Sequence, residues 1–144
     1  MSGYVIAREN FKEASRHVSA EQDPVMFNLL YGLHEALEML EGEGLDTVFA
    51  RHKRWSAGVR AAVEAWGLPV QCADKDLHSP ILTGVIVPKG VDADALRKTI
   101  LQRFDLSLGS ALGKIKGRTF RIGHLGYSND LTLLATLAGC EMGL

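Results

Sequence analysis

The chain has 144 residues, of which 47% are hydrophobic and 23% charged, a composition typical of one globular domain with its own core. Sixteen basic residues against seventeen acidic ones leave a formal net charge of −1, so we expect no nucleic-acid binding through phosphate neutralisation. No apolar run approaches the ~20 residues that span a bilayer, and residues 1–22 lack the apolar segment of a signal peptide. We therefore expect a cytoplasmic protein that binds no membrane.

The first third of the chain predicts helices. Residues 4–20 carry a thin apolar stripe, and Pro24 then interrupts the pattern. Residues 28–40 have leucines at helical spacing, and glycines at 42 and 44 mark the end of this helix.

A long amphipathic helix is expected over about residues 45–66, with Gly67 at its C-terminal cap. Its basic run, residues 51–54, could suggest an anion site. We interpret it instead as a solvated helix face, because the charges spread around the helix and no aromatic platform accompanies them.

The rest of the chain alternates strand and helix signals. Asp92 is expected to cap one helix, and Ser128 or Asn129 another. The predicted order is strands at 68–73 and 81–87, a helix at 92–104, a short strand at 106–108, a strand within 117–126 and a helix at 131–142. This order favours an α+β fold, in which a small, mainly antiparallel sheet is covered by helices on one face.

The strand within residues 117–126 (Gly-Arg-Thr-Phe-Arg-Ile-Gly-His-Leu-Gly) contains the most informative residue, Arg121. Alternation along a strand puts Arg121 on the face opposite Phe120 and Ile122, which are expected in the core. A guanidinium fixed in this way suits a carboxylate, since its planar fork can donate two parallel hydrogen bonds. The residues alone leave a second interpretation open, in which Arg121 is a surface arginine paired with an acidic side chain.

Other candidate motifs fail on spacing. Residues 109–115 have three residues between the glycines and Ile115 after the lysine, so they do not form a phosphate-binding P-loop, although a loop that closes over a ligand stays possible. Residues 34–38 lack the second histidine of a zinc helix and are interpreted as an exposed polar pair. His78 and His124 could act as acid or base, but no partner is marked nearby. We therefore expect no metal site and no catalytic residue in this chain.

Several segments together resemble one enzyme family, the class V pyridoxal-phosphate aminotransferases, with the greatest likeness to the serine–glyoxylate and alanine–glyoxylate aminotransferases. The likeness is continuous and in family order over about residues 28–144. The segments that carry it are 28–37 (Asn-Leu-Leu-Tyr-Gly-Leu-His-Glu-Ala-Leu), 44–52 (Gly-Leu-Asp-Thr-Val-Phe-Ala-Arg-His), 120–126 (Phe-Arg-Ile-Gly-His-Leu-Gly), 127–133 (Tyr-Ser-Asn-Asp-Leu-Thr-Leu) and 141–144 (Glu-Met-Gly-Leu).

The resemblance implies that residues 28–144 form the C-terminal small domain of such an enzyme, preceded by an N-terminal segment, residues 1–27, expected to be helical. By the same resemblance, Arg121 holds the α-carboxylate of the amino or keto acid, and the parent enzyme uses pyridoxal phosphate. No cofactor-binding residue is expected in this chain.

The chain also departs from the family pattern. The large domain that carries the Schiff-base lysine is absent, and none of the seven lysines has the family's context. The family's tyrosine and Thr-Pro pair are replaced at residues 23–27 by Asp-Pro-Val-Met-Phe. We therefore expect no catalysis by this chain alone. Two interpretations follow: a detached aminotransferase domain, or a binding or self-association module that kept the fold. In both, a homodimer is expected.

Overall fold

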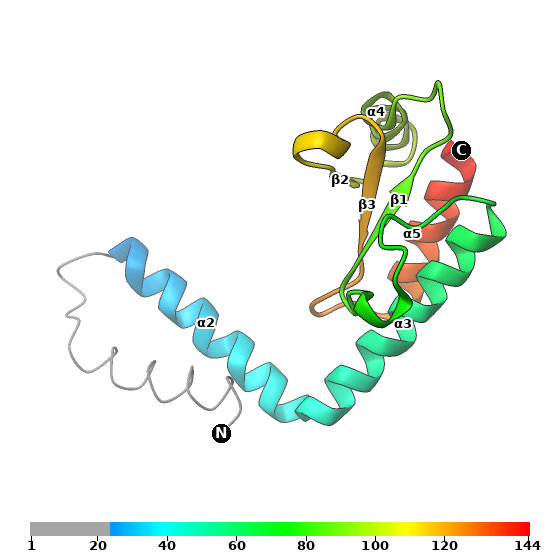
Figure 1. Ribbon diagram of the computed structural model, residues 1–144. Helices are drawn as coiled ribbons and strands as arrows, with labels where there is room; N and C mark the ends of the chain where they lie inside the picture. The colour runs from blue at the N-terminus through cyan, green and yellow to red at the C-terminus, as the bar shows by residue number, and fades with distance from the viewer. Residues whose placement is uncertain (1–23) are drawn as a thin grey trace. The chain divides into compact units, whose positions relative to one another are not determined.

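A computed structural model describes residues 24–144 of the chain (Figure 1). These residues belong to two compact units, Met1–Phe49 and Ala50–Leu144, and each unit is described by itself. The helix predicted over residues 4–20 lies outside the described residues, and the domain boundary expected near residue 28 stays a prediction. Among residues 24–144, no helix has the length and the apolar character needed to cross a membrane.

Of the helices predicted before residue 67, the two that fall within the described residues are present. Helix α2 spans Pro24–Glu43 and is followed by Gly44, whose φ of +82° is a conformation that glycine adopts readily. Helix α3 spans Leu45–Ala65, and Gly67, with a φ of +71°, follows its last turn as expected. Several large apolar side chains of α2 are exposed, among them Leu29 at 71% and Tyr31 at 68%.

The second unit is built on a three-stranded antiparallel sheet, as expected. Strand β3 (Thr119–Gly123) lies in the centre, between β1 (Leu82–Ile86) and β2 (Gly109–Ser110). Helix α4 (Ala93–Phe104) connects β1 to β2, and α5 (Asp130–Gly143) follows β3. The side chain of Asp92 caps α4 and that of Asn129 caps α5, and both caps agree with the sequence.

The core lies on one face of this sheet. Phe120, Ile122 and Val85 are fully buried there, and they pack against residues from three helices. The helical members of the core are Val59 and Val63 of α3, Ala93 and Ile100 of α4, and Cys140 of α5. Burial raises the pKa of the Cys140 thiol to about 12, so this cysteine is a packing residue rather than a reactive one. The α+β prediction is thereby confirmed, with the helices on the Phe120 face.

Two predicted strands differ from the structure, each for a local reason. The strand expected at residues 68–73 is reduced to a single bridge between Val70 and Val85, because Pro69 has no N–H to donate to a ladder. The short strand expected at residues 106–108 begins later, at Gly109. Arg97 Nε lies 2.8 Å from the carbonyl oxygen of Leu108 and donates to it, so that carbonyl is engaged by α4.

An acidic side chain at the start of α5 ties that helix to α3. Both terminal nitrogens of Arg54 donate to the Asp130 carboxylate at 2.9 Å, and Trp55 Nε1 donates to its Oδ1 at 2.7 Å. These bonds, from Arg54 first and then Trp55, hold the pKa of the Asp130 carboxyl below its usual value. The guanidinium of Arg51 lies over the Trp55 ring, 4.6 Å from its centroid. Part of the basic run at residues 51–54 is thus packed against neighbouring residues rather than only solvated.

Two helical glycines allow a matched test of the packing. A Cβ atom at Gly143 in α5 would overlap Cγ1 of the buried Ile100, whereas a Cβ at Gly58 in α3 would meet nothing within 4 Å. We expect Gly143→Ala to lower the free energy of unfolding by about 1–3 kcal/mol through overpacking. Gly58→Ala should raise it by about 0.5–1 kcal/mol through helix propensity. Urea unfolding of both variants measures this, and equal signs would contradict the described packing of α5 on α4.

Candidate functional site

The candidate site is centred on Arg121, in the middle of the central strand. Its cross-strand partners are both glycines: Gly84 of β1 on one side and Gly109 of β2 on the other. Side chains directly opposite each other in an antiparallel pair share one face of the sheet and touch. The half-buried stem of Arg121 therefore has no side chain beside it on either neighbouring strand.

The guanidinium of Arg121 has no partner among residues 24–144. Its Nε atom is buried without a hydrogen-bond partner, and no ion pair or hydrogen bond joins its terminal nitrogens to another described residue. The other half-buried arginines of the described chain behave differently. Arg97, for example, donates to the Leu108 carbonyl and to Asp94, and Arg60 to Ser79 and Ser56. A held but unpaired cation is an arrangement that suits an anionic ligand.

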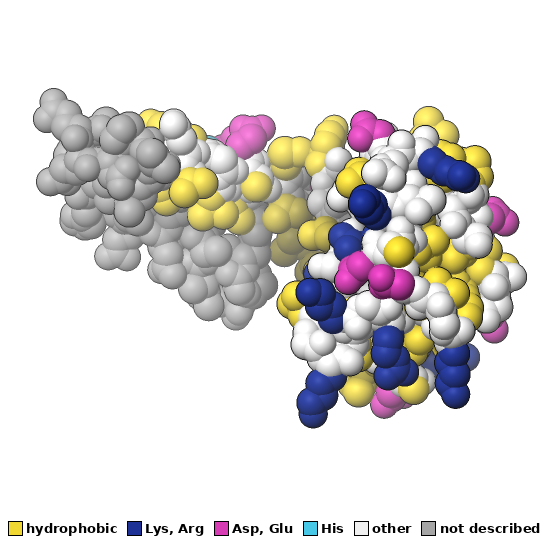
Figure 2. All heavy atoms as spheres, turned by 90° about the horizontal axis from the view of Figure 1, so that it is seen from above, with side chains coloured by type: hydrophobic (Ala, Val, Ile, Leu, Met, Phe, Trp, Pro, Cys, Tyr) yellow, Lys and Arg dark blue, Asp and Glu magenta, His cyan; other side chains and the backbone are white. Residues whose placement is uncertain are grey.

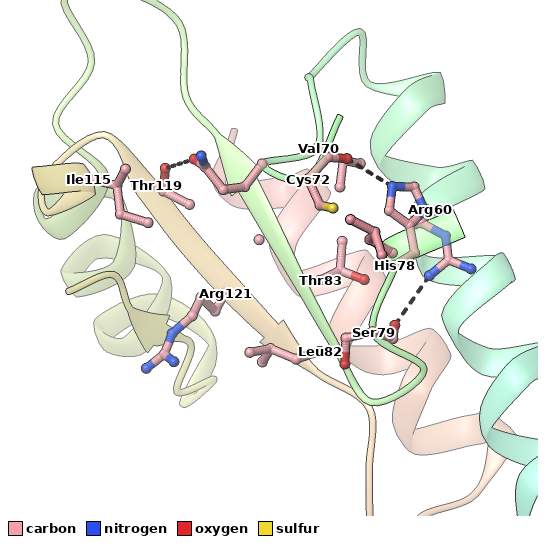
Figure 3. A pocket seen from close by; sticks show the side chains of 13 residues that line it. Arg60, Val70, Cys72, His78, Ser79, Leu82, Thr83, Ile115, Thr119 and Arg121 are labelled. Carbon is pink, nitrogen blue, oxygen red and sulfur yellow. Dashed lines mark hydrogen bonds between the residues drawn. The ribbon is translucent and has the colours of Figure 1, made fainter. Parts of the chain in front are cut away.

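A pocket of about 230 Å³ lies over the face of the sheet that carries the Arg121 stem. Figure 3 shows its lining, with Leu82 and Thr83 in the middle and Ile115 at one end. Thr119 Oγ1 donates to Gln71 Oε1 at 2.9 Å, and Gln71 N donates to the Gly84 carbonyl at 2.8 Å, so the segment before β1 forms part of the wall. Most of the surface that lines this pocket is apolar.

The two arginines that line this pocket, Arg121 and Arg60, lie at different ends of it. Figure 3 shows the Arg121 fork beside β2, on the side of β3 away from Arg60 and His78. His78 Nε2 lies 2.8 Å from the Cys72 carbonyl oxygen, and Arg60 donates to the Ser79 carbonyl at 3.4 Å. Arg60 and His78 thus have backbone partners in the segment before β1, whereas the guanidinium of Arg121 has no partner among the described residues.

His124, which the sequence left as a possible acid or base, is only 2% exposed. Its Nε2 lies 2.9 Å from Thr83 Oγ1, and its buried Nδ1 has no partner. Burial lowers the pKa of His124 below its usual 6.5, and the nearby Arg60 and His52 act in the same direction. Because its ring is enclosed and bonded to Thr83, we interpret His124 as a structural group.

The remaining motifs do not form sites among residues 24–144. His34 Nε2 lies 3.6 Å from Glu38 Oε1, and both side chains are exposed, which is the polar pair that the sequence predicts. No cluster of three or more His, Cys, Asp or Glu side chains suitable for a metal ion occurs in the described part of the chain. In the stretch compared with a P-loop, Gly109 and Ser110 are paired in β2, so this part belongs to the sheet.

The sequence identified Arg121 as a candidate but not Gly84 and Gly109, its two cross-strand partners. A signal was present for Gly84, because an isolated glycine inside a strand pattern indicates that another group approaches closely. For Gly109 the sequence offered no comparable signal, because this residue was expected in a loop rather than in a strand. Only the register, which pairs Gly109 with Arg121, shows what the missing side chain leaves room for.

Two of the relatives found by sequence are serine–glyoxylate aminotransferases. The enzyme from Hyphomicrobium methylovorum is 44% identical over 116 residues, which are 81% of this chain and 29% of that protein. The enzyme from Arabidopsis thaliana is 46% identical over 114 residues, 79% of this chain and 28% of that protein. This chain therefore spans less than a third of these relatives and matches their C-terminal region. No protein-family model matches the chain.

Solved structures show the same relationship. The ureidoglycine–glyoxylate aminotransferase from Bacillus subtilis superposes with a TM-score of 0.74 and 35% identity. The superposition covers 79% of this chain and 30% of that one. The resemblance to this enzyme class noted in the sequence is thus confirmed by relatives in both sequence and structure.

The buried His124 makes a pH-dependent contribution to stability. Its pKa is lowered in the folded state, so the unfolded chain binds the extra proton as the pH falls through 6.5, and the free energy of unfolding decreases. We expect a loss between pH 7.5 and pH 5.5 of at most about 1.4 kcal/mol per pH unit for one proton. Denaturant unfolding at the two pH values measures it. In His124→Gln the dependence should shrink, and an unchanged slope would remove His124 as its source.

Proposed function

Because the chain belongs to the class V pyridoxal-phosphate aminotransferases of the serine–glyoxylate type and corresponds to their C-terminal part, we propose that it supplies the substrate-carboxylate arginine of such an enzyme. The observation that carries the proposal is the state of Arg121. Its stem is held between two glycines on the central strand, and its guanidinium has no partner among the described residues. The substrate would be an amino acid or a 2-oxo acid.

Arg121 binds and orients; it transfers no proton. Its guanidinium keeps its charge at all working pH values, and its planar fork matches a carboxylate in two parallel hydrogen bonds. Each hydrogen bond to a charged group contributes about 1.5–3 kcal/mol. Such an anchor fixes the carboxylate relative to the sheet, so that the Cα of the substrate is presented in one direction to the remainder of the enzyme.

The described residues do not fit the cofactor of this family. Pyridoxal phosphate supplies an electron sink when it is bound, and it is held by a Schiff base to a lysine that the protein encloses. The lysines among residues 24–144 all have exposed side chains; they are Lys53, Lys75, Lys89, Lys98, Lys114 and Lys116. We therefore propose that the catalytic lysine belongs to a large domain outside this chain, and that the chain by itself does not catalyse transamination.

The partners proposed for this chain agree with its surface. On the face that Figure 2 shows, lysine and arginine side chains of the second unit are spread over the surface rather than gathered in one basic patch. Together with the formal net charge of −1, this argues against nucleic acid. Exposed apolar side chains on α2, such as Leu29 and Tyr31, favour self-association as a homodimer. The same exposure supports a second candidate function, a self-association module that kept the fold and lost the enzymatic role.

Restoring the large domain tests the role of Arg121. We would fuse the chain to the N-terminal part of the H. methylovorum enzyme, whose C-terminal region is 44% identical. The fusion should catalyse amino transfer from serine to glyoxylate. In the fusion, Arg121→Lys should raise KM for both substrates about ten-fold or more, since losing one charge-assisted bond removes about 1.5–3 kcal/mol. Steady-state kinetics and the melting temperature are measured together.

Arg118→Lys is the matched control, because Arg118 is an exposed arginine just before the same strand. It should leave KM and melting temperature near those of the parent fusion. If Arg121→Lys lowers the melting temperature and leaves KM unchanged, Arg121 is a structural residue and the proposal fails. If the fusion folds, binds cofactor and remains inactive, the self-association module is favoured instead.

The exposure of every lysine among residues 24–144 predicts how the chain responds to pyridoxal phosphate. We expect borohydride reduction of the mixture to label several exposed lysines weakly and without saturation, because none of those described is enclosed. Visible absorbance and mass mapping of the reduced peptides measure this. Saturable labelling of one lysine at stoichiometric cofactor would show that the chain carries a cofactor site of its own.

A further inference from the structure

We propose that Gly109 is a positioning residue, which fixes the direction of the Arg121 guanidinium by bringing the backbone of β2 against its Nε atom. The proposal rests on the function proposed above for Arg121 and adds a residue that this function requires. It also specifies the binding mode: a carboxylate would be held end-on by the two terminal nitrogens.

The contact between the two residues is close. A Cβ atom at position 109 would lie 3.1 Å from Arg121 Cβ and 3.3 Å from Arg121 Nε. The backbone of Gly109 is outside the left-handed region, so its φ angle does not require glycine. The reason for a glycine here is therefore space, and the group that uses this space is the Arg121 side chain.

The surroundings of Arg121 Nε indicate how the contact with Gly109 affects the guanidinium. Nε is buried and has no hydrogen-bond partner among the described residues, so no acceptor directs the guanidinium. Its direction is then set by the surfaces on each side of the stem, and Gly109 is one of these, because a Cβ atom there would lie 3.3 Å from Nε. With Nε covered, the terminal nitrogens are left for a ligand, and Figure 3 shows the Arg121 fork beside β2, on the side of β3 away from Arg60 and His78.

The backbone at Gly109 is held in place by the residues on either side of it, Leu108 and Ala111, so it can restrict the Arg121 side chain. Strand β2 has only two residues, and pairing alone would hold it weakly. On one side, Leu108 is 5% exposed and its carbonyl accepts from Arg97 Nε at 2.8 Å. On the other side, Ala111 is 2% exposed. Arg97 thus acts on Arg121 indirectly, through the position of β2.

Gly84 provides the matched control on the opposite side of Arg121. It pairs with Arg121 in the same row of the sheet, and its φ is also outside the left-handed region. A Cβ there would meet Gln71 Cβ at 3.0 Å and Thr119 Cγ2 at 3.6 Å, and no atom of Arg121 within the nearest contacts. A methyl group added at position 84 perturbs the same sheet without pressing on the guanidinium.

The test follows the Arg121 Nε–H directly, by NMR of the full chain labelled with ¹⁵N-arginine. The resonance is assigned by its loss in Arg121→Lys, and its exchange rate with water is measured. We expect exchange at least about ten-fold faster in Gly109→Ala, because displacement of the stem exposes Nε, and a rate within about two-fold of wild type in Gly84→Ala. An unchanged rate in Gly109→Ala, or an equal rise in Gly84→Ala, overturns the proposal.

A second variant decides the case if Gly109→Ala fails to fold. Arg97→Lys keeps a positive charge near Asp94, adds no atom to the sheet and removes the Nε donor to Leu108. It should also accelerate Arg121 Nε–H exchange, by several-fold, and wild-type exchange in this variant would overturn the proposal.

Titration with sodium acetate distinguishes the positioning role of Gly109 from the carboxylate-binding role of Arg121. Wild-type chain should show a shift of the Arg121 resonance, with an apparent Kd several-fold weaker in Gly109→Ala. No response to acetate in wild type, together with faster exchange in Gly109→Ala, would contradict the carboxylate role and support the positioning role. A response in wild type with equal affinity and exchange in Gly109→Ala would overturn the positioning role alone.

Discussion

An arginine on the central strand of a sheet has a cross-strand partner on each side. The size of these two partners decides how much room the arginine side chain has. Here both cross-strand partners of Arg121 are glycines, so the stem lies in a row of the sheet that has no other side chain. Hydrogen bonds to other described residues do not fix the guanidinium. In the account proposed here, the shape of the surrounding backbone fixes its direction, and the unpaired charge can serve a ligand.

This arrangement depends on a rigid support behind the sheet. Phe120 and Ile122 flank Arg121 in sequence and are fully buried on the opposite face, where α3, α4 and α5 cover them. The Asp130 carboxylate accepts three hydrogen bonds from Arg54 and Trp55 and joins the start of α5 to α3. A strand anchored on one face by core packing can present a charged side chain on the other with little freedom, which is what an anchor for a substrate requires.

Much of this could be predicted from the sequence, because hydrophobic periodicity and capping residues are local signals. They located helices α2 to α5, the strands at β1 and β3, and the two faces of β3. What could not be predicted depends on contacts between distant segments. The strand expected at residues 68–73 is limited by Pro69, and the start of β2 by the bond from Arg97 to the Leu108 carbonyl. The pairing of Gly84 and Gly109 with Arg121 requires the register, which no single segment contains. The ligand proposed for Arg121 rests on family resemblance, not on spacing.

The central claim is that Arg121 binds a substrate carboxylate through its terminal nitrogens. A crystal structure of the chain grown with a high concentration of glyoxylate tests it most directly. The account predicts a carboxylate held end-on by the two terminal nitrogens of Arg121, at about 2.7–2.9 Å, with Nε still covered by Gly109. A carboxylate bound elsewhere while Arg121 pairs with an acidic side chain of the protein would contradict it.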